Sequence, residues 1–213
     1  MSIGSAIIGL EKELPPAVKL VAVSKFHPAQ AVMEAYSCGQ RAFGESRPQE
    51  LAAKAAVLPS DIEWHFIGHL QTNKIKTVLQ YASLIESVDS EHLLKEIDSC
   101  AASLGKVADC LLEIHISSEE SKQGFSFEEA GELLARKDEF MNVRIRGLMG
   151  MASFTDDAVT VRHEFKRLKE FYDTMSGHSL EILSMGMSSD WRLAVEEGTN
   201  LVRIGTAIFG ERK

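Results

Sequence analysis

The residue best placed to do chemistry is Lys25, which closes the first strongly apolar run of the chain at residues 20–25. An ammonium group at the end of a buried strand is costly to desolvate, and desolvation lowers the pKa of a lysine. The neutral amine can attack an aldehyde and form a Schiff base. The alternative is a structural lysine whose side chain snorkels to water. Position alone favours the structural alternative, so the surroundings of Lys25 must decide.

Two clusters near the C-terminus contain the residue types that bind phosphate. Glycines allow backbone N–H groups to approach an anion, hydroxyls add donors, and the start of a helix adds partial positive charge. Ser184 belongs to the first cluster, and Gly205 and Thr206 belong to the second. These residues predict a phosphate site. Taken alone, the pair Gly205 and Gly210 would indicate only a tight closure of the last strand.

The elements that must position these residues follow from the alternation of apolar runs with segments of helical period. Eight apolar runs end near Ser24, Gly44, Gly68, Ser87, Ile116, Gly150, Met185 and Gly205. Near-continuous hydrophobic runs are typical of parallel strands that are covered on both faces. At about 25 residues per strand and helix, the pattern favours a closed (β/α)8 barrel over an open sheet. We expect one α/β barrel domain over residues 1–213.

Helix signals agree with this alternation. Ser126 and Glu129 have the spacing of a capping box, and Ser90 precedes an apolar stripe that ends at Gly105. A further stripe recurs at steps of four and three residues and predicts a helix that packs on the sheet. Its members are Val161, Phe165, Leu168, Tyr172 and Met175.

The barrel prediction changes the interpretation of Lys25. Active sites of such barrels lie at the C-terminal ends of the strands, and phosphate is often bound by the loops after strands seven and eight. Lys25, Ser184 and Thr206 would then face one mouth, with the lysine on one side and the phosphate site on the other. Pyridoxal phosphate requires this arrangement, because its aldehyde bonds to a lysine while its phosphate anchors the ring.

Arg203 has two interpretations, since it alternates with the apolar residues Val202 and Ile204. Beside the pyridine nitrogen of the cofactor, a fixed cation disfavours protonation of that nitrogen and weakens the ring as an electron sink. As a structural residue, Arg203 would instead form an ion pair inside the barrel, with Glu113 as a candidate partner. Both interpretations stay open.

Other polar residues offer less chemistry. His65 and His69 are four residues apart on a predicted strand, which separates them by roughly 13 Å and excludes joint metal ligation. We expect His65 to be a buried or hydrogen-bonded histidine. An enzyme that used Lys25 would also need a base, for which His69, Lys122 and Tyr36 are candidates without a supporting motif.

Composition narrows the class of protein. The net charge of −8 disfavours binding to nucleic acid, because such affinity depends on clustered cations. The first residues lack a basic region, and no apolar run approaches the length of a membrane span, so we expect a soluble cytoplasmic protein. We also expect it to be a monomer. Three cysteines without a C-x-x-C pair signal neither disulfides nor zinc; we expect small buried hydrophobic residues at Cys38, Cys100 and Cys110.

Several segments closely resemble the pyridoxal phosphate homeostasis proteins, the YggS/PROSC family. They are residues 21–25, 43–45, 49–50, 64–68, 70–74, 146–149, 183–188 and 202–210. The resemblance covers about residues 19–210. The strings Trp-His-Phe-Ile-Gly and Arg-Ile-Gly-Thr-Ala-Ile-Phe-Gly are its most specific parts.

The resemblance implies a single barrel like the N-terminal domain of alanine racemase, with bound pyridoxal phosphate. By position, Lys25 would be the Schiff-base lysine and Arg203 the neighbour of the pyridine nitrogen. Ser184, Gly205 and Thr206 would contact the phosphate. The chain departs from the family pattern at two positions, with Ser46 where Asn is usual and His69 where Pro is frequent. A ring or hydroxyl contact of that Asn is therefore in doubt.

The predicted function is to carry pyridoxal phosphate without catalysis and to maintain vitamin B6 and amino-acid pools. A racemase on this barrel needs a second acid or base on the opposite face of the cofactor, usually from another domain, and a mouth that excludes water. We expect no second domain in these 213 residues. Enzymes that lack their pyridoxal phosphate are candidate recipients. The alternatives are a weak racemase or aldolase that uses Lys25, and an interaction module without cofactor.

Overall fold

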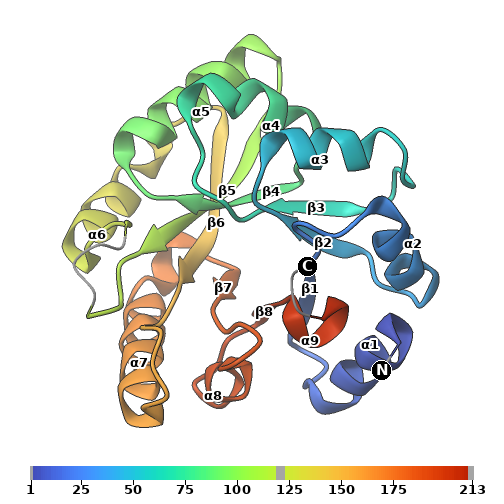
Figure 1. Ribbon diagram of the computed structural model, residues 1–213. Coiled ribbons are helices and arrows are strands. Elements are labelled where there is room, and N and C mark those ends of the chain that lie inside the picture. The colour runs from blue at the N-terminus through green and yellow to red at the C-terminus, as the bar shows by residue number, and fades with distance from the viewer. Residues whose placement is uncertain (1, 119–122, 211–213) are drawn as a thin grey trace.

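Eight parallel strands close into a barrel in the order β1 to β8 in the computed structural model, which describes residues 2–118 and 123–210 (Figure 1). The strands are β1 (Lys19–Val23), β2 (Ala42–Glu45), β3 (Glu63–Phe66), β4 (Leu84–Val88), β5 (Ala108–Ile114), β6 (Val143–Gly150), β7 (Ile182–Ser184) and β8 (Leu201–Ile204). Closure comes from pairing of β1 with β8, in which Val21 lies opposite Arg203. The predicted (β/α)8 barrel is confirmed.

Helices surround the strands and connect them (Figure 1). They are α1 (Ile3–Glu13), α2 (Ala29–Ser37), α3 (Pro48–Ala55), α4 (Ile75–Tyr81), α5 (Glu91–Ser103), α6 (Phe127–Ala135), α7 (Ala158–Thr174), α8 (Trp191–Glu196) and α9 (Thr206–Phe209). Short 3-10 helices occur at η1 (Thr72–Lys74), η2 (Lys137–Glu139) and η3 (Ser176–His178). α1 precedes the barrel and packs beside α2 and α9.

The local helix signals act as predicted. Ser126 accepts the N–H of Glu129 at 3.2 Å, and the Glu129 carboxylate accepts the N–H of Ser126 at 2.8 Å, so the capping box of α6 is complete. Ser90 caps α5 by accepting the N–H of Leu93 at 3.3 Å. Gly105, just past the end of that helix, has a φ of 62°, which glycine adopts without steric cost.

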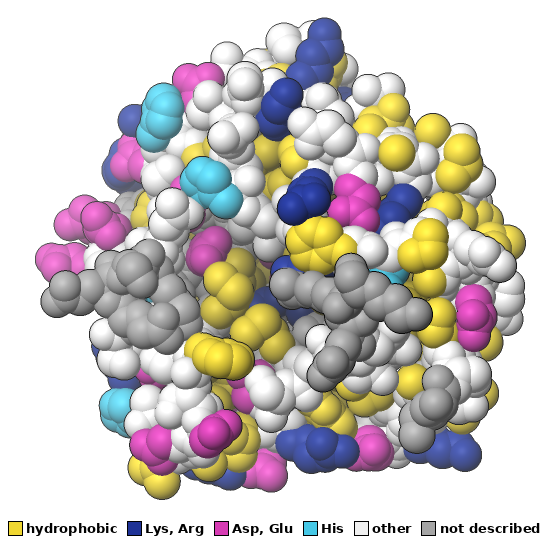
Figure 2. All heavy atoms as spheres, in the orientation of Figure 1, with side chains coloured by type: hydrophobic (Ala, Val, Ile, Leu, Met, Phe, Trp, Pro, Cys, Tyr) yellow, Lys and Arg dark blue, Asp and Glu magenta, His cyan; other side chains and the backbone are white. Residues whose placement is uncertain are grey.

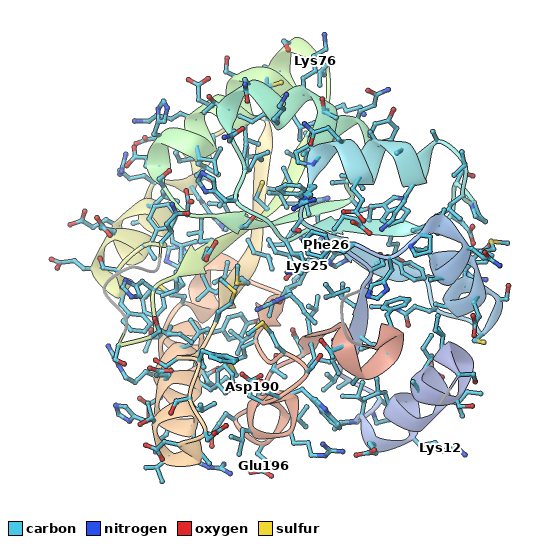
Figure 3. The ribbon with its side chains drawn as sticks, in the orientation of Figure 1. Lys12, Lys25, Phe26, Lys76, Asp190 and Glu196 are labelled. Carbon is cyan, nitrogen blue, oxygen red and sulfur yellow. The ribbon has the colours of Figure 1, made fainter. Side chains whose placement is uncertain are left out.

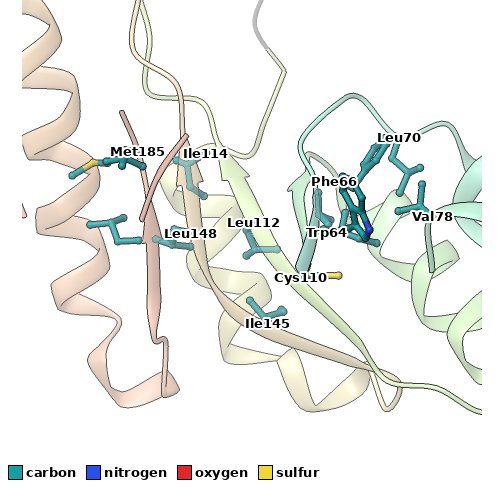
Figure 4. Packing of buried hydrophobic residues seen from close by; sticks show 14 of the residues in the cluster. Trp64, Phe66, Leu70, Val78, Cys110, Leu112, Ile114, Ile145, Leu148 and Met185 are labelled. Atoms are coloured by element: carbon teal, nitrogen blue, oxygen red, sulfur yellow. The ribbon is translucent and has the colours of Figure 1, made fainter. Parts of the chain in front are cut away.

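The main hydrophobic core lies between the strands and the helices. Trp64 and Phe66 on β3 point outward and pack near Leu70 and Val78, as Figure 4 shows. The stripe predicted for α7 packs in this layer too, with Val161, Phe165 and Leu168 buried and Tyr172 and Met175 partly buried. Burial of both strand faces explains why the strand runs are almost continuously apolar.

Small apolar clusters fill the middle of the barrel. One contains Val21, Ala42 and Leu201, and the other contains Leu84, Leu111 and Met149. Because side chains alternate along a strand, residues two positions after an inward residue also face inward. Polar residues that follow these positions therefore enter the barrel toward its C-terminal mouth.

The surface mixes both signs of charge. Figure 2 shows basic and acidic side chains interspersed on the face that is drawn. Within residues 2–118 and 123–210, no helix combines the length and the apolar character needed to cross a bilayer. Cys110 is buried, as predicted, but Cys100 is only half-buried. Cys38 is exposed, because it ends α2 at the surface.

Candidate functional site

Lys25 lies at the C-terminal mouth of the barrel, two residues after the end of β1. Ser24 is fully buried and extends the pairing of β1, since its N–H donates to the carbonyl of Gly44 at 3.0 Å. Lys25 itself is half-buried. Figure 3 shows Lys25 and Phe26 toward the centre of the ring of strands. The predicted position of the lysine at a barrel mouth is confirmed.

Gly205, and the Thr206 that follows it, come at the end of the strand next to Lys25 rather than across the mouth from it. A Cβ atom on Gly205 would lie 3.1 Å from the carbonyl oxygen of Val23, which is tighter than ordinary van der Waals contact. Glycine therefore lets the end of β8 pass close to the end of β1. The expected arrangement on opposite sides is wrong, because closure of the barrel pairs β1 with β8.

Ser188 joins this cluster, although the sequence analysis did not single it out. The N–H of Gly205 donates to Ser188 Oγ at 3.2 Å. Its loop is organised by Asp190, whose carboxylate accepts the N–H of Met187 at 2.6 Å. The serine residues that follow Gly186 were the available sequence signal, but nothing local indicated which of them approaches Gly205.

Ser184 and Arg203 belong to a buried polar network inside the barrel. The Arg203 guanidinium is 4% exposed, donates to Ser184 Oγ, and donates to the carbonyl of Gly150 at 3.1 Å. Ser184 Oγ donates to Glu86 Oε2 at 2.6 Å. His65 Nδ1 lies 2.6 Å from Glu86 Oε1. Glu86 therefore links β3, β7 and β8.

The charge of Glu86 is stabilised by its partners. Burial alone raises the pKa of this carboxyl, but the hydrogen bond and charge of His65 and the charge of Arg203 outweigh burial and hold the pKa below its ordinary value. Arg203 Nη1 lies 3.5 Å from Glu86 Oε2. A buried cation thus has an ionised counterpart within the same network.

The structural interpretation of Arg203 is correct, but its partner is Glu86 rather than Glu113. Glu86 and Ser184 present oxygens to the guanidinium from β4 and β7. A role of Arg203 at the pyridine nitrogen is compatible with this ion pair and stays a prediction. The role of Ser184 as a phosphate contact also stays a prediction, and its hydroxyl is engaged with Glu86 and Arg203.

Glu113 is a buried carboxyl near the same mouth. Burial is the main cause that raises its pKa to about 7, and the charge of Asp89 adds to it. The charges of Arg203 and His69 oppose the shift. Glu113 therefore changes its charge close to neutral pH.

Replacing Glu113 with glutamine is expected to remove a pH-dependent loss of stability. Between the ordinary carboxyl pKa of 4.5 and about 7, the folded protein holds a proton that the unfolded chain has released. Stability therefore falls as pH rises through this window, by about 3 kcal/mol in total. Urea unfolding at pH 5 and pH 8 measures the effect. Glu113→Gln should gain stability over the wild type at pH 8 only, and an equal difference at both pH values would contradict the assignment.

The other polar residues considered in the sequence analysis lie in different environments. His65 is buried and hydrogen-bonded, as predicted. The side chain of His69 is 56% exposed, and its Nδ1 lies 3.1 Å from Asp89. Tyr36 was wrong as a candidate base, because its hydroxyl donates to Asp61, before β3, at the N-terminal end of the barrel. Lys122 lies outside the described residues.

The backbone after β2 is close to the backbone after β3, and the described residues form no metal-ligand cluster. Ser46 directly follows β2, and its backbone lies so close to Gly68 that a Cβ there would come within 2.2 Å of the Ser46 carbonyl oxygen. Among residues 2–118 and 123–210, no three His, Cys, Asp or Glu side chains gather as metal ligands.

The opposite end of the barrel is closed by ion pairs. A cavity of about 400 Å³ lies there, lined by residues from the N-terminal ends of the strands. Lys19 pairs with Glu63, and Arg146 lies 2.7 Å from Asp109. These charges are partnered with one another, whereas Lys25 and the other predicted site residues lie at the opposite mouth.

Comparison with known proteins agrees with this geometry. A family model described as the N-terminal domain of alanine racemase matches residues 8–213. A pyridoxal phosphate homeostasis protein of Aquifex aeolicus is 41% identical over 199 residues, which cover 92% of this chain and 87% of that protein.

Solved structures give the same relationship. PipY of Synechococcus elongatus PCC7942 superposes with a TM-score of 0.94 at 39% identity without PLP, and 0.90 at 38% identity with PLP bound. In both cases 98% of this chain and 100% of that chain are covered. Alanine racemase of Clostridium difficile 630 has a TM-score of 0.84 at 14% identity and is covered over 56% of its length, which shows a shared fold alone.

Proposed function

The chain belongs to the family of pyridoxal phosphate homeostasis proteins, and we propose that it holds pyridoxal 5′-phosphate as a Schiff base on Lys25 without catalytic turnover. The observation that carries this proposal is the position of Lys25, half-buried at the mouth on the strand next to β8, whose end leads into Gly205 and Thr206. An amine and a set of hydrogen-bond donors for an anion are then available at the same mouth. PLP supplies the aldehyde, and the protein supplies the amine and the anchor for the phosphate.

The start of α9 fits a phosphate group. The first N–H that returns to Gly205 is that of Ile208, at 2.8 Å, so the N–H groups of Thr206 and Ala207 have no acceptor within the helix. Thr206 is exposed. Gly205 brings the start of this helix close to the end of β1, because a Cβ there would lie 3.1 Å from the carbonyl oxygen of Val23.

Arg203 supports storage rather than turnover in this proposal. The guanidinium is fixed by Ser184, Gly150 and Glu86. Near a pyridine nitrogen, such a cation disfavours protonation of the ring and weakens its capacity to stabilise a carbanion. A cofactor in this setting is held in a weakly activated form.

The surroundings of the mouth also favour a carrier. Racemisation needs an acid or base on each face of the cofactor. His69 is exposed and paired with Asp89, and Tyr36 lies at the other end of the barrel. The proposal includes a cytoplasmic monomer that supplies the cofactor to enzymes that lack it, and through this maintains vitamin B6 and amino-acid pools.

Trapping the covalent bond tests the proposal. The protein is incubated with pyridoxal phosphate, its visible absorbance is recorded, and borohydride is added to reduce the C=N bond to a stable secondary amine. Peptide mass mapping should locate the modification on Lys25. Protein that stays colourless and unlabelled, or carries the label on another lysine, would overturn the assignment.

The enzyme alternative has its own measurement. Amino acids are incubated in deuterium oxide with the protein and saturating pyridoxal phosphate, and exchange of the α-hydrogen and loss of chirality are followed. The carrier proposal expects no exchange above that of free cofactor. Sustained exchange that disappears in Lys25→Ala would establish an enzyme instead.

Thr206→Ala is expected to weaken retention of pyridoxal phosphate about tenfold, because one hydrogen bond to a charged group is lost. The rate of cofactor loss after dilution measures this effect. Thr174→Ala, an exposed position at the end of α7, serves as the matched control. Equal rates for the two variants would show that Thr206 does not contact the phosphate.

A further inference from the structure

Lys54 on α3 is a buried lysine close to the proposed site. It is 5% exposed, although lysine is among the residues least often buried. Its ammonium donates to the carbonyl of Ser24 at 2.8 Å, to Glu45 Oε1 at 2.7 Å and to Glu50 Oε1 at 2.8 Å. An ammonium has three donors, so Lys54 is fully engaged.

These contacts reach both peptide groups of Lys25. The carbonyl of Ser24 belongs to the peptide group that precedes Lys25, and Lys54 holds it directly. The N–H of Phe26 belongs to the peptide group that follows, and it donates to Glu50 Oε1 at 2.7 Å. Lys54 and Glu50 therefore fix the backbone on both sides of the Schiff-base lysine.

The backbone held in this way is a strained one. Phe26 has a φ of 68°, in the left-handed region, where the Cβ of a non-glycine residue is crowded by the backbone. Such a conformation persists only where its surroundings enforce it. Glu50 enforces it through the N–H of Phe26, and the Arg47 guanidinium lies 4.5 Å from the centre of the Phe26 ring.

Glu45 ties the cluster to the end of β1. Ser24 Oγ donates to Glu45 Oε1 at 2.6 Å, so the same carboxylate oxygen meets Ser24 and Lys54. Burial raises the pKa of Glu45, and the hydrogen bond and charge of Lys54 oppose the rise. Without Lys54, Glu45 and Glu50 would be two neighbouring carboxylates with no cation between them.

We infer that Lys54 is a positioning residue, which together with Glu45 and Glu50 presents the Lys25 amine to an incoming aldehyde. This inference rests on the proposed function. In the covalent step, the neutral amine of Lys25 adds to the aldehyde carbon, and its two hydrogens leave with the aldehyde oxygen as water. Lys54 takes no part in that exchange, because its own donors are committed to three oxygens.

Lys54→Met tests the inference, since methionine removes the charge and keeps an unbranched side chain. Two quantities are measured: the rate of Schiff-base formation with pyridoxal phosphate, and the affinity for pyridoxine 5′-phosphate. The second compound carries an alcohol in place of the aldehyde and cannot bond to lysine. Lys54→Met should slow the covalent step about tenfold, as expected for loss of charge-assisted hydrogen bonds, and leave the affinity for the alcohol unchanged.

Lys76→Met is the matched control, because Lys76 is an exposed lysine on α4, distant from Lys25 in Figure 3. It should alter neither quantity. Glu50→Gln provides a second variant if Lys54→Met does not fold. In Glu50→Gln, Lys54 keeps its hydrogen bonds to Ser24 and Glu45, but the acceptor of the Phe26 N–H is weaker. This variant should slow Schiff-base formation less than Lys54→Met does.

The outcomes separate the two proposals. If the wild type forms no Schiff base, the proposed function fails. If the wild type reacts and both Lys54→Met and Glu50→Gln react as fast, only the positioning role fails. A parallel loss of affinity for pyridoxine 5′-phosphate would show that Lys54 is merely structural, which also overturns the inference.

Discussion

Lys25→Ala is expected to abolish covalent binding of pyridoxal phosphate while the barrel stays folded. The side chain is half-buried at the mouth and lies beyond the last residue of β1, so its truncation leaves no cavity in the hydrophobic core. Lys54 cannot replace it, because its ammonium is buried and donates to three acceptors. The visible absorbance and the borohydride-stable mass increase should both disappear.

Lys25→Ala should still bind pyridoxal phosphate without a covalent bond, and more weakly than the wild type binds it. The proposed phosphate contacts at Gly205 and Thr206 do not depend on the lysine side chain. Titration with pyridoxine 5′-phosphate should therefore give the wild-type affinity. Lys12→Ala, on the exposed side of α1, is the control and should keep the covalent adduct. An adduct of undiminished yield in Lys25→Ala would contradict the assignment of the lysine.

Glu86→Gln is expected to cause the largest loss of stability among the substitutions considered. It leaves the Arg203 guanidinium buried without its counter-charge and replaces the carboxylate that faces His65 Nδ1 by an amide. Breaking a buried pair on one side costs about 3–5 kcal/mol. Denaturant unfolding at neutral pH measures the difference in free energy. Glu181→Gln, an exposed partner of Arg146, is the control and should change stability little.

The pH dependence of that difference has a defined sign. Because the pKa of Glu86 is lowered in the folded protein, its stabilisation is present above the ordinary carboxyl pKa of 4.5. It is lost as pH falls below that value, through the lowered folded pKa. The gap between the wild type and Glu86→Gln should therefore shrink in acid. A gap that is constant with pH would show that shape rather than charge stabilises the network.

The double variant Glu86→Gln with Arg203→Met measures how much the interaction between Glu86 and Arg203 contributes to stability. Removal of both charges should cost less than the sum of the single substitutions, because neither partner is then left buried and unpaired. The double variant also tests the proposed role of Arg203, since its loss should not prevent bonding of the cofactor to Lys25. Additive losses of stability would show that the two residues are uncoupled.

The sequence by itself determined the elements of this protein and the end of the barrel that carries its chemistry. Strand period, helix period and capping residues act over a few neighbouring positions, so they can be read locally. The apolar run that stops at Lys25 therefore places that lysine at a strand end. The inward position of Arg203 follows in the same way, because side chains alternate along β8.

Only the tertiary structure decided which side chains meet. Arg203 pairs with Glu86 rather than Glu113, and Gly205 lies against Val23. Both contacts join strands that are far apart in sequence, and closure of the barrel determines the register of those strands. No sequence pattern indicated that Lys54 is buried, since a lysine on a short helix usually faces solvent. It is buried because α3 folds back over the ends of β1 and β2. Long-range register depends on the whole closed sheet, and no local pattern contains it.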